Sequence, residues 1–383
     1  NKMNKELRLA IPINSLGYGM HATAHYKALI ENSNLDIKLE PIGNLSNVNQ
    51  ILRELEISKQ RFDLDLKRNI AGDATSFILW HSDQLPAHLG KGLNVGATLF
   101  ETDKLMSKEL NGLRSVDKVA TYSDWGVDVL KKHDIEASKI MGPCVPSYTD
   151  TYNKVKTFEL LDLEIGANKV ILSPGKWEIR KGHPDFVSDI SILAKTRHFS
   201  VFAFWNNIFT GGLAQPVQCL LDNGWKLTGQ YSRNGSMLYS YGLENATVYL
   251  FGHLDSHEEL MSLYKRADIM ASYSAGEGWD LPCVDAIYMH CDVIATDNTA
   301  HEEYKSHFKY QMLCKPEVAD DGIWFKRNRG NWYPPVSPHN RNAIARAIDD
   351  NENIDFKSEN SKSIASFCSL DKISKSIVDI CLL

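Results

Sequence analysis

The sequence predicts an α/β protein made of two facing, Rossmann-like, doubly wound domains with a cleft between them. The chain has 383 residues, more than one ordinary core organises. Short apolar runs alternate with helical patterns along its length, as strands and helices do in parallel sheets. The alternation occurs in two halves, separated by residues 148–169, which lack a strong apolar face. Parallel sheets of this kind bind ligands at the carboxyl ends of their strands, so we expect a site in the cleft.

The apolar runs place the expected strands. In the first half these cover residues 7–13, 37–41, 76–81, 93–100, 118–123 and 140–144, and in the second half residues 169–173, 199–205, 247–252, 268–273 and 292–296. We expect domains over residues 1–155 and 165–350. Helices over residues 340–349, 363–370 and 372–383 are expected to end the chain, and in the segment 351–383 the last of them is expected to cross back to the first domain.

Composition narrows the class of protein. Hydrophobic residues make up 43% and charged residues 23% of the chain, as in a soluble globular protein. The net charge of −6 argues against a broadly basic nucleic-acid binder. The seven cysteines show no CxxC spacing, which favours reduced thiols over disulfides or a zinc site. No apolar run approaches the ~18 residues of a membrane span. We expect a cytoplasmic protein whose natural first residue is Met3.

The turn after residues 268–273 carries the strongest chemical signal. It contains Glu277 and Gly278, and a helix opens with Pro282 near its start. Such a turn leaves backbone N–H groups aimed at one point, which attracts a phosphate. Glu277 and, eight positions later, Asp285 add carboxylates, which suit sugar and ribose hydroxyls. A diphosphate between two sugars is a nucleotide-sugar, and this turn suits one.

Three separated segments carry a family resemblance. They are residues 170–183, residues 250–268, and residues 274–303 with the Glu277-x7-Asp285 pattern. Together they resemble the retaining glycosyltransferases of family 4 (glycosyl transferases group 1), over roughly residues 165–305. The resemblance implies the GT-B fold and transfer of a hexose or pentose from a nucleoside-diphosphate sugar, with a UDP-sugar expected, to an acceptor hydroxyl. It also implies that no metal and no cofactor are needed, because the nucleotide-sugar is a co-substrate.

The resemblance assigns roles to five residues in the second half. Lys181 and Lys176, with Arg180 beside them, are expected to grip the donor diphosphate and to stabilise the charge that develops on it. Glu277 is expected to contact the donor sugar and Asp285 the ribose. The family usually has Arg at 176 and Glu at 285, so this chain loses bidentate gripping at the first position and a methylene of reach at the second.

The same turn supplies the remaining donor-side residues. Gly278, Trp279, Asp280 and Leu281 are expected to lie against the donor. Asp280 stands where the family often has glycine. It is also a candidate N-cap for the helix that starts near Leu281. Since a carboxylate repels a diphosphate, we expect Asp280 to turn toward a sugar hydroxyl or solvent.

In the first half, Gly17, Tyr18 and Gly19 form a glycine turn between a strand and a helix. The resemblance places this turn across the cleft, against the donor phosphates and sugar. The same letters fit the G-x-G-x-x-A dinucleotide fingerprint, with Glu40 near the expected acidic position. An NAD(P)-dependent oxidoreductase is therefore the alternative function, and a non-catalytic sugar-nucleotide-binding subunit is a third.

Other polar residues of the first half are candidates for catalysis, in the case of His81, or for binding the acceptor. His81 ends a predicted strand and either contacts the donor sugar near the reacting centre or is hydrogen-bonded in a loop. Glu101 and Asp103 either bind acceptor hydroxyls or cap the following helix. His21 has a weaker claim.

Two further patterns occur in the sequence. Asp63 and Asp65 spell the D-x-D of metal-dependent transferases but lie in a charged amphipathic stretch, which we interpret as a solvated helix face without a metal. Cations and aromatics mix in residues 323–333. Lys326, Arg327 and Arg329 could contact an anionic acceptor, including a hydroxymethylated base in DNA. The acceptor stays open between a glycan, a lipid-linked sugar and such a base, and the oligomeric state stays unknown.

Overall fold

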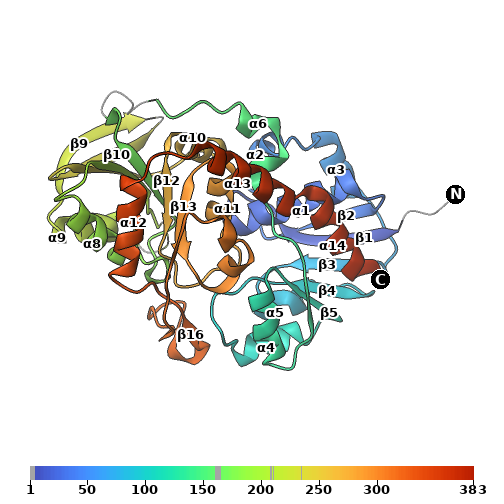
Figure 1. Cartoon of the computed structure of the whole chain (residues 1–383). Helices are drawn as coiled ribbons and strands as arrows, with labels where there is room; N and C mark the ends of the chain where they lie inside the picture. Colours follow the sequence, from blue (N-terminus) through green and yellow to red (C-terminus); the bar gives the residue numbers. More distant parts are fainter. Residues whose placement is uncertain (1–4, 160–164, 208, 210, 234) are drawn as a thin grey trace.

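The computed structural model describes residues 5–159, 165–207, 209, 211–233 and 235–383. Figure 1 shows two α/β halves side by side, the N-terminal half in blue to teal and the C-terminal half in green to orange. Each half is a sheet with helices packed on it, which confirms the predicted fold class. In the described residues no helix has the length and apolar character that crossing a membrane requires.

The N-terminal sheet is parallel throughout, in the strand order β2-β1-β3-β4-β5-β6. Its strands are β1 Glu6–Pro12, β2 Asp36–Ile42, β3 Thr75–Leu79, β4 Asn94–Ala97, β5 Lys118–Thr121 and β6 Ala137–Lys139. Its helices are α1 Gly17–Asn32, α2 Val48–Glu54, α3 Lys59–Lys67, α4 Ser107–Leu113 and α5 Asp124–Lys131.

The C-terminal sheet has the order β14-β13-β12-β7-β8-β11-β10-β9, and its pairs are parallel except for β11–β10 and β10–β9, which are antiparallel. Its strands are β7 Lys169–Pro174, β8 Phe199–Phe204, β9 Lys226–Arg233, β10 Ser236–Leu243, β11 Ala246–Phe251, β12 Ile269–Ser272, β13 Asp292–Thr296 and β14 Tyr310–Met312. The helices of this half are α8 His183–Leu193, α9 Ala214–Asp222, α10 His257–Arg266, α11 Leu281–Tyr288 and α12 His339–Asp349.

The strand predicted over residues 140–144 is wrong. The Ile140 N–H still donates to the Thr121 carbonyl at 2.9 Å, but Pro143 and Pro146 then end the ladder because proline has no N–H to donate. Residues Val145–Tyr148 form instead the 3₁₀ turn η2, which packs against α11 of the other half. The antiparallel pair β9–β10 was not predicted, since the side chains of β9 are largely exposed and form no apolar run.

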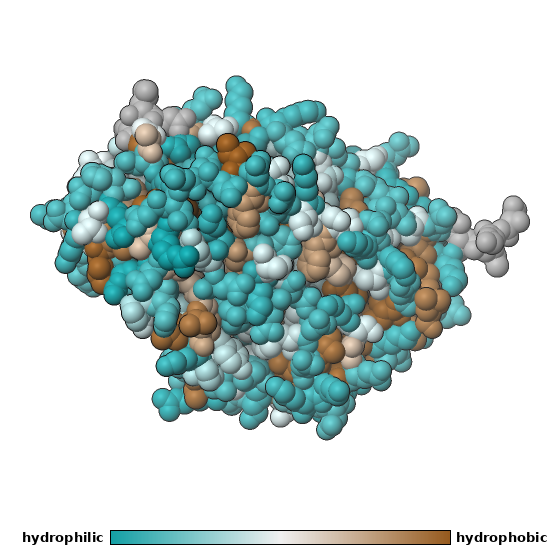
Figure 2. All heavy atoms as spheres, in the orientation of Figure 1, coloured by the Kyte–Doolittle hydropathy of each residue, from teal (hydrophilic) through white to brown (hydrophobic). Residues whose placement is uncertain are grey.

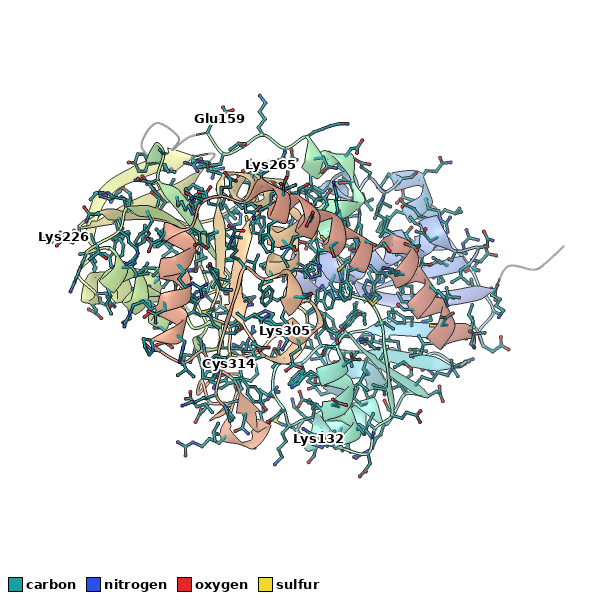
Figure 3. All side chains as sticks on the ribbon, in the orientation of Figure 1. Lys132, Glu159, Lys226, Lys265, Lys305 and Cys314 are labelled. Carbon is teal, nitrogen blue, oxygen red and sulfur yellow. The ribbon has the colours of Figure 1, made fainter. Side chains whose placement is uncertain are left out.

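Two segments join the halves. Residues 148–159, with α6 Asp150–Asn153, lead to the C-terminal half. Lys265 of α10, labelled in Figure 3, holds residues 153–155 against the C-terminal half, because its ammonium donates to the Asn153 and Val155 carbonyls at 2.9 and 2.5 Å. The predicted linker residues 160–164 lie outside the described part of the chain.

The C-terminal helices return to the first half. α13 Ile354–Phe367 packs on α11, and α14 Leu370–Leu382 packs on α1. Figure 1 shows these two red helices crossing from one half to the other. The Lys118 ammonium also donates to the Ile380 carbonyl at 2.9 Å. Buried residues of both halves consequently form one continuous hydrophobic cluster. The face in Figure 2 is mostly hydrophilic, with apolar residues in small groups.

Candidate active site

The loops after β7 and β12 meet because these strands are parallel neighbours and end at the same edge of the sheet. The loop after β7 contains the 3₁₀ turn η3 Ile179–Lys181 and ends at Gly182, which has φ +68°. A Cβ at Gly182 would lie 2.5 Å from the Tyr273 carbonyl oxygen, so only glycine allows this approach. The loop after β12 carries Glu277, and the close approach brings Lys181 to it.

Glu277 is the centre of the contacts. Its Oε1 accepts hydrogen bonds from the Lys181 ammonium at 2.5 Å and the Ser274 hydroxyl at 2.6 Å, and Arg180 Nη1 lies 3.0 Å away. The Glu277 N–H donates to the Thr299 hydroxyl at 2.9 Å. Within the described part of the chain these side-chain contacts all fall on Oε1. The second oxygen, Oε2, therefore keeps its acceptor capacity for a ligand hydroxyl.

Lys181 is charged in this setting. Burial alone would lower the pKa of its ammonium, but the adjacent Glu277 carboxylate outweighs burial and the pKa is raised. A cation and a carboxylate are thus held together, with 15% and 8% of their side-chain surfaces exposed. The pair can present a positive charge to an anion and an acceptor oxygen to a hydroxyl at the same time.

Arg180 and Lys176 differ in their freedom. Arg180 is tied down: Nη1 donates to the Gly276 carbonyl at 2.6 Å and Nη2 donates to Glu178 at 3.2 Å, with 10% of the side chain exposed. The Lys176 side chain is 51% exposed, and its ammonium lies 3.4 Å from Glu178. The Lys176 ammonium also lies over the Phe209 ring, 5.4 Å from its centroid, so Lys176 is half exposed with two contacts, whereas Arg180 orders the loop that carries Glu277.

The expectation for Asp280 is wrong. Its side chain turns inward, away from solvent, and Oδ2 lies 2.8 Å from His301 Nε2. Although Asp280 occupies the N-cap position of α11, its side chain accepts no capping hydrogen bond. Its φ of +72° is left-handed, which is the physical reason that glycine suits this position.

Asp280 and His301 form a charged pair. Burial would raise the pKa of the Asp280 carboxyl, but Lys181 and the hydrogen bond from His301 hold it well below its usual range. Burial likewise opposes protonation of His301, but Asp280 outweighs burial and raises the histidine pKa. His301 Nδ1 lies 2.8 Å from the Thr296 carbonyl, so both ring nitrogens donate, as in an imidazolium.

Asp280, Cys283 and His301 are also a possible set of metal ligands, since one donor atom from each lies within 4.8 Å of the others. The Asp280–His301 distance of 2.8 Å decides against that interpretation. Two tetrahedral ligands at zinc bond lengths lie roughly 3.3–3.7 Å apart. The shorter separation is that of a hydrogen-bonded ion pair.

Asp285 is 1% exposed and lies on α11 next to the first residue of α10. Its Oδ2 is 3.5 Å from His257 Nε2, and burial raises the pKa of the carboxyl although His257 opposes this. The other oxygen, Oδ1, is buried and has no hydrogen-bond partner among the described residues, so the ribose contact that the resemblance implies stays a prediction.

The loop after β12 presses on the N-terminal half. A Cβ at Gly276 would lie 2.2 Å from the Glu101 carbonyl oxygen, and one at Gly278 would lie 2.8 Å from the Leu99 Cβ. Trp279 is buried, and its indole donates to the Pro143 carbonyl at 2.9 Å. Leu281 packs against the core that the halves share. Gly278, Trp279 and Leu281 thus build the contact between the halves.

Glu101 lies across that contact from the site. Burial raises the pKa of its carboxyl, the Arg180 charge lowers it, and the net shift is upward. Within the described residues its carboxylate accepts no hydrogen bond. Glu101 is thus a carboxyl from the first half that lies beside Arg180 and Glu277 with its acceptor capacity unused.

The first loop also reaches this contact. α1 begins at Gly17, and a Cβ at Gly19 would lie 2.2 Å from the Asn14 carbonyl oxygen. The Tyr18 hydroxyl donates to the Leu99 carbonyl at 3.3 Å, and its ring centroid is 4.9 Å from that of His81. Tyr18 and His81 thus lie together, on the strand-end side of the N-terminal sheet.

Asp103 and His21 have structural contacts instead of open ones. The Asp103 carboxylate accepts from the Asn331 N–H and the Tyr333 hydroxyl, both at 2.7 Å, which joins the two halves. His21 is 2% exposed on α1, packed against His25 and Tyr122. Burial, aided by His25, holds the His21 pKa well below its usual range.

The cationic segment 326–329 is only partly free. Lys326 and Arg327 are exposed, and Arg327 Nε lies 3.2 Å from Asp320. Arg329 turns inward, 3.3 Å from Glu109 and over the Phe325 ring. Its guanidinium is therefore part of the contact between the halves.

The D-x-D segment is not wholly the solvated face we predicted. Asp63 is exposed beside Lys59, but Asp65 is fully buried. Its Oδ2 accepts from the Tyr26 hydroxyl at 3.0 Å and from Arg61 Nε at 2.7 Å. These contacts give Asp65 a structural role in α3.

Sequence reasoning missed Ser274, Glu178, Thr299 and His301 as parts of the site. A signal existed for Glu178, because it stands between two cations in the order Lys176, Glu178, Arg180. Thr299 and His301 had none, because their partners Glu277 and Asp280 lie 22 and 21 positions away, whereas Ser274 lies only three positions before its partner Glu277.

Comparison with known proteins gives a family match over part of the chain. Residues 163–323 match the family described as Glycosyl transferases group 1. A comparison with curated protein sequences finds no match.

Solved structures share the fold over nearly the whole chain. The N-terminal domain of Candida albicans trehalose-6-phosphate phosphatase matches with TM-score 0.64, 10% identity, and 99% and 97% of the two chains covered. Sucrose-phosphate synthase from Thermosynechococcus elongatus matches with TM-score 0.62, 11% identity, and 98% of each chain covered. Anabaena HepE in complex with UDP matches with TM-score 0.60, 12% identity, and 98% and 99% covered. The family match over residues 163–323 and the architecture of the whole chain together support a glycosyltransferase with the GT-B fold.

Proposed function

We propose that the protein is a retaining glycosyltransferase of family 4 that moves a sugar from a nucleoside-diphosphate sugar to an acceptor hydroxyl without a metal ion. A UDP-sugar is the first donor to test, and the structural neighbour HepE, which was solved with UDP, supports that choice. The observation that carries the proposal is the buried pair of Lys181 and Glu277, joined at 2.5 Å where two parallel strands end.

Lys181 and Glu277 have different roles in this mechanism. As the bond from the anomeric carbon to the phosphate oxygen breaks, the electron pair stays on the diphosphate, and the Lys181 charge stabilises it. Lys176, whose side chain is half exposed, adds a second charge. Glu277 orients the sugar through Oε2 while Lys181, Ser274 and Arg180 hold Oε1. Glu277 is not assigned as a covalent nucleophile.

The acceptor approaches the face from which the diphosphate leaves. Its oxygen forms the new bond to the anomeric carbon, and its proton passes to the departing phosphate. This front-face course retains the anomeric configuration and uses no separate general base. Glu101 and His81 belong to the half that faces the donor loops and are the groups we assign to positioning. Holding both reactants in line supplies much of the rate enhancement.

A thermal-shift screen of nucleotide-sugars tests donor binding. The true donor at 100 times its Kd should stabilise the protein by about 2.7 kcal/mol. With that donor, Lys181→Ala and Glu277→Gln should each lower transfer by at least ~100-fold. Lys305→Ala is a matched control, because Lys305 is also ion-paired, to Asp297 at 2.7 Å. Full activity of Lys181→Ala would remove the assignment, and loss of activity on EDTA treatment would contradict a metal-free mechanism.

The alternatives have distinct readouts. An NAD(P)-dependent oxidoreductase would change pyridine-nucleotide absorbance. Against it, the Glu40 carboxylate of the fingerprint is bonded to Arg8 Nε at 2.6 Å. A non-catalytic subunit would bind the donor but neither transfer the sugar nor hydrolyse the donor. Comparing glycan, lipid-linked and hydroxymethylated-DNA acceptors separates the acceptor classes. For DNA, loss of binding in Lys326→Ala and Arg327→Ala would locate the contact at the exposed part of segment 326–329.

A further inference from the structure

Glu178 lies between two of the cations assigned to the diphosphate and contacts both. Its Oε1 is 3.4 Å from the Lys176 ammonium, and its Oε2 accepts from Arg180 Nη2 at 3.2 Å. Only 16% of the Glu178 side chain is exposed. One carboxylate therefore bridges two cations in the loop after β7, using one oxygen for each.

The Glu178 carboxylate is ionised at neutral pH. Burial would raise its pKa, but Arg180 and Lys176 outweigh burial and hold the pKa below its usual range. Glu178 is thus a fixed negative charge beside the proposed diphosphate position. It repels that anion and competes with it for Lys176.

The two cations respond differently to this competition. Arg180 keeps its contacts with Gly276 and Glu277 whatever Glu178 does. Lys176 has one described carboxylate partner, Glu178, and a half-exposed side chain. Exchange of partners with a bound anion therefore concerns Lys176, whose ammonium also lies over the Phe209 ring at 5.4 Å from its centroid.

Competition matters most after transfer. Cleavage of the sugar–phosphate bond leaves the electron pair on the diphosphate, and the proton received from the acceptor is released to water near neutral pH. The product then carries one more negative charge than the donor and holds the cations more tightly. A group that takes Lys176 back lowers this product affinity.

We propose that Glu178 is a positioning residue that reclaims Lys176 from the nucleoside diphosphate and so speeds product release. The proposal rests on the proposed glycosyltransferase function and deepens it. It predicts that the carboxylate weakens binding of the product more than binding of the donor, because the product has the greater charge.

The test is Glu178→Gln, which keeps the shape and an acceptor for Arg180 but removes the charge. Binding of UDP, GDP and ADP is measured by calorimetry on the full chain. The nucleotide that wild type binds best should bind the variant about three- to tenfold more tightly. Under multiple turnover, kcat and the product-inhibition constant should fall, while the single-turnover transfer rate changes less than twofold. A merely structural role would not separate these two rates.

Three further proteins sharpen the result. Glu178→Asp retains the charge but is too short to bridge both cations, and it should give an intermediate gain if the Gln variant folds poorly. Adding Lys176→Ala to Glu178→Gln should abolish the gain. Glu31→Gln, which removes a charge ion-paired to Lys27 on α1, should leave nucleotide binding unchanged.

The failure modes are distinguishable. If wild type binds a nucleoside diphosphate but Glu178→Gln binds it no more tightly, the product-release role is overturned and the proposed function stands. If wild type binds none of the three nucleotides, the proposed function falls together with this inference.

Discussion

Replacing Asp280 by glycine removes one partner of a buried ion pair and, in the same step, relieves a left-handed backbone. The two effects oppose each other, and their sizes follow from the structure. The Asp280 and His301 side chains are 2% and 0% exposed, and breaking a buried pair on one side costs about 3–5 kcal/mol. The φ of +72° costs a non-glycine residue about 1 kcal/mol, which glycine recovers. The expected net loss for Asp280→Gly is about 2–4 kcal/mol.

His301→Gln has no such relief and should lose about 3–5 kcal/mol. The double variant Asp280→Gly with His301→Leu removes both charges and keeps an apolar side chain of similar volume. Its stability should return to within ~1 kcal/mol of wild type, because no unpaired charge is left buried. Urea titrations and thermal melts of wild type, Asp280→Gly, His301→Leu and the double variant form a double-mutant cycle. At about 2–4 °C for each kcal/mol in a unit of 150–250 residues, the melting temperature of Asp280→Gly should drop by at least ~4 °C.

The Asp280–His301 pair also determines the direction in which stability changes with pH. The Asp280 pKa is depressed, so its contribution is present above the unfolded value of about 3.9 and is lost as pH falls below it. The His301 pKa is raised, so its contribution is full below about 6.5 and is lost as pH rises through the folded value. The difference in stability between wild type and the double variant should peak at about pH 4–6.5. Equal stability of wild type and Asp280→Gly at pH 6, or a double variant no better than His301→Gln, would refute this reasoning.

Three more perturbations address the contact between the halves. Gly276→Ala places a Cβ 2.2 Å from the Glu101 carbonyl oxygen, so it should separate the halves and lower the transfer rate at least ~10-fold. The control is Gly72→Ala, whose Cβ would have no atom within 4 Å. It should change neither the activity nor the small-angle scattering profile. Asp103→Ala removes the hydrogen-bond acceptor of Asn331 and Tyr333, so it should lower the free energy of unfolding by about 1–3 kcal/mol and speed proteolysis of residues 320–333. An unchanged cleavage rate would argue that these hydrogen bonds do not hold the segment in place. Because the Glu101 pKa is raised, nucleoside-diphosphate affinity should fall as pH rises through that pKa, and calorimetry across pH should show a flat profile for Glu101→Gln.

Local patterns predicted the parts of the site that lie within one strand–turn–helix unit. The apolar runs located β7 and β12, and the glycines and proline after them located the loops that carry Lys181 and Glu277. These features depend on backbone geometry over a few residues, which the sequence displays directly. The same logic failed where a run of apolar letters, residues 140–144, meets two prolines and the other half of the molecule.

Partners distant in sequence were beyond such patterns. Asp280 was expected to face solvent or a sugar, yet its position is set by His301, a residue 21 positions away. Asp103 was expected to bind the acceptor or to cap a helix, but its carboxylate accepts a hydrogen bond from the N–H of Asn331, a residue 228 positions away. Charge and polarity in the sequence report that a side chain needs a partner, and only the tertiary structure decides which partner it takes.

The internal pairing of charges has a consequence for donor recognition. Lys181 is paired with Glu277, Arg180 with Glu277 and Glu178, and Lys176 with Glu178, so three cations share two carboxylates and one positive charge is left over. A diphosphate competes with these carboxylates for the cations, so its affinity is the difference between two sets of ion pairs. That difference is small compared with the gross attraction of three cations, and it favours a ligand that satisfies the displaced carboxylate as well. A sugar that donates a hydroxyl to Glu277 does so and a bare diphosphate does not, which is how a site with these cations can prefer the nucleotide-sugar to its product.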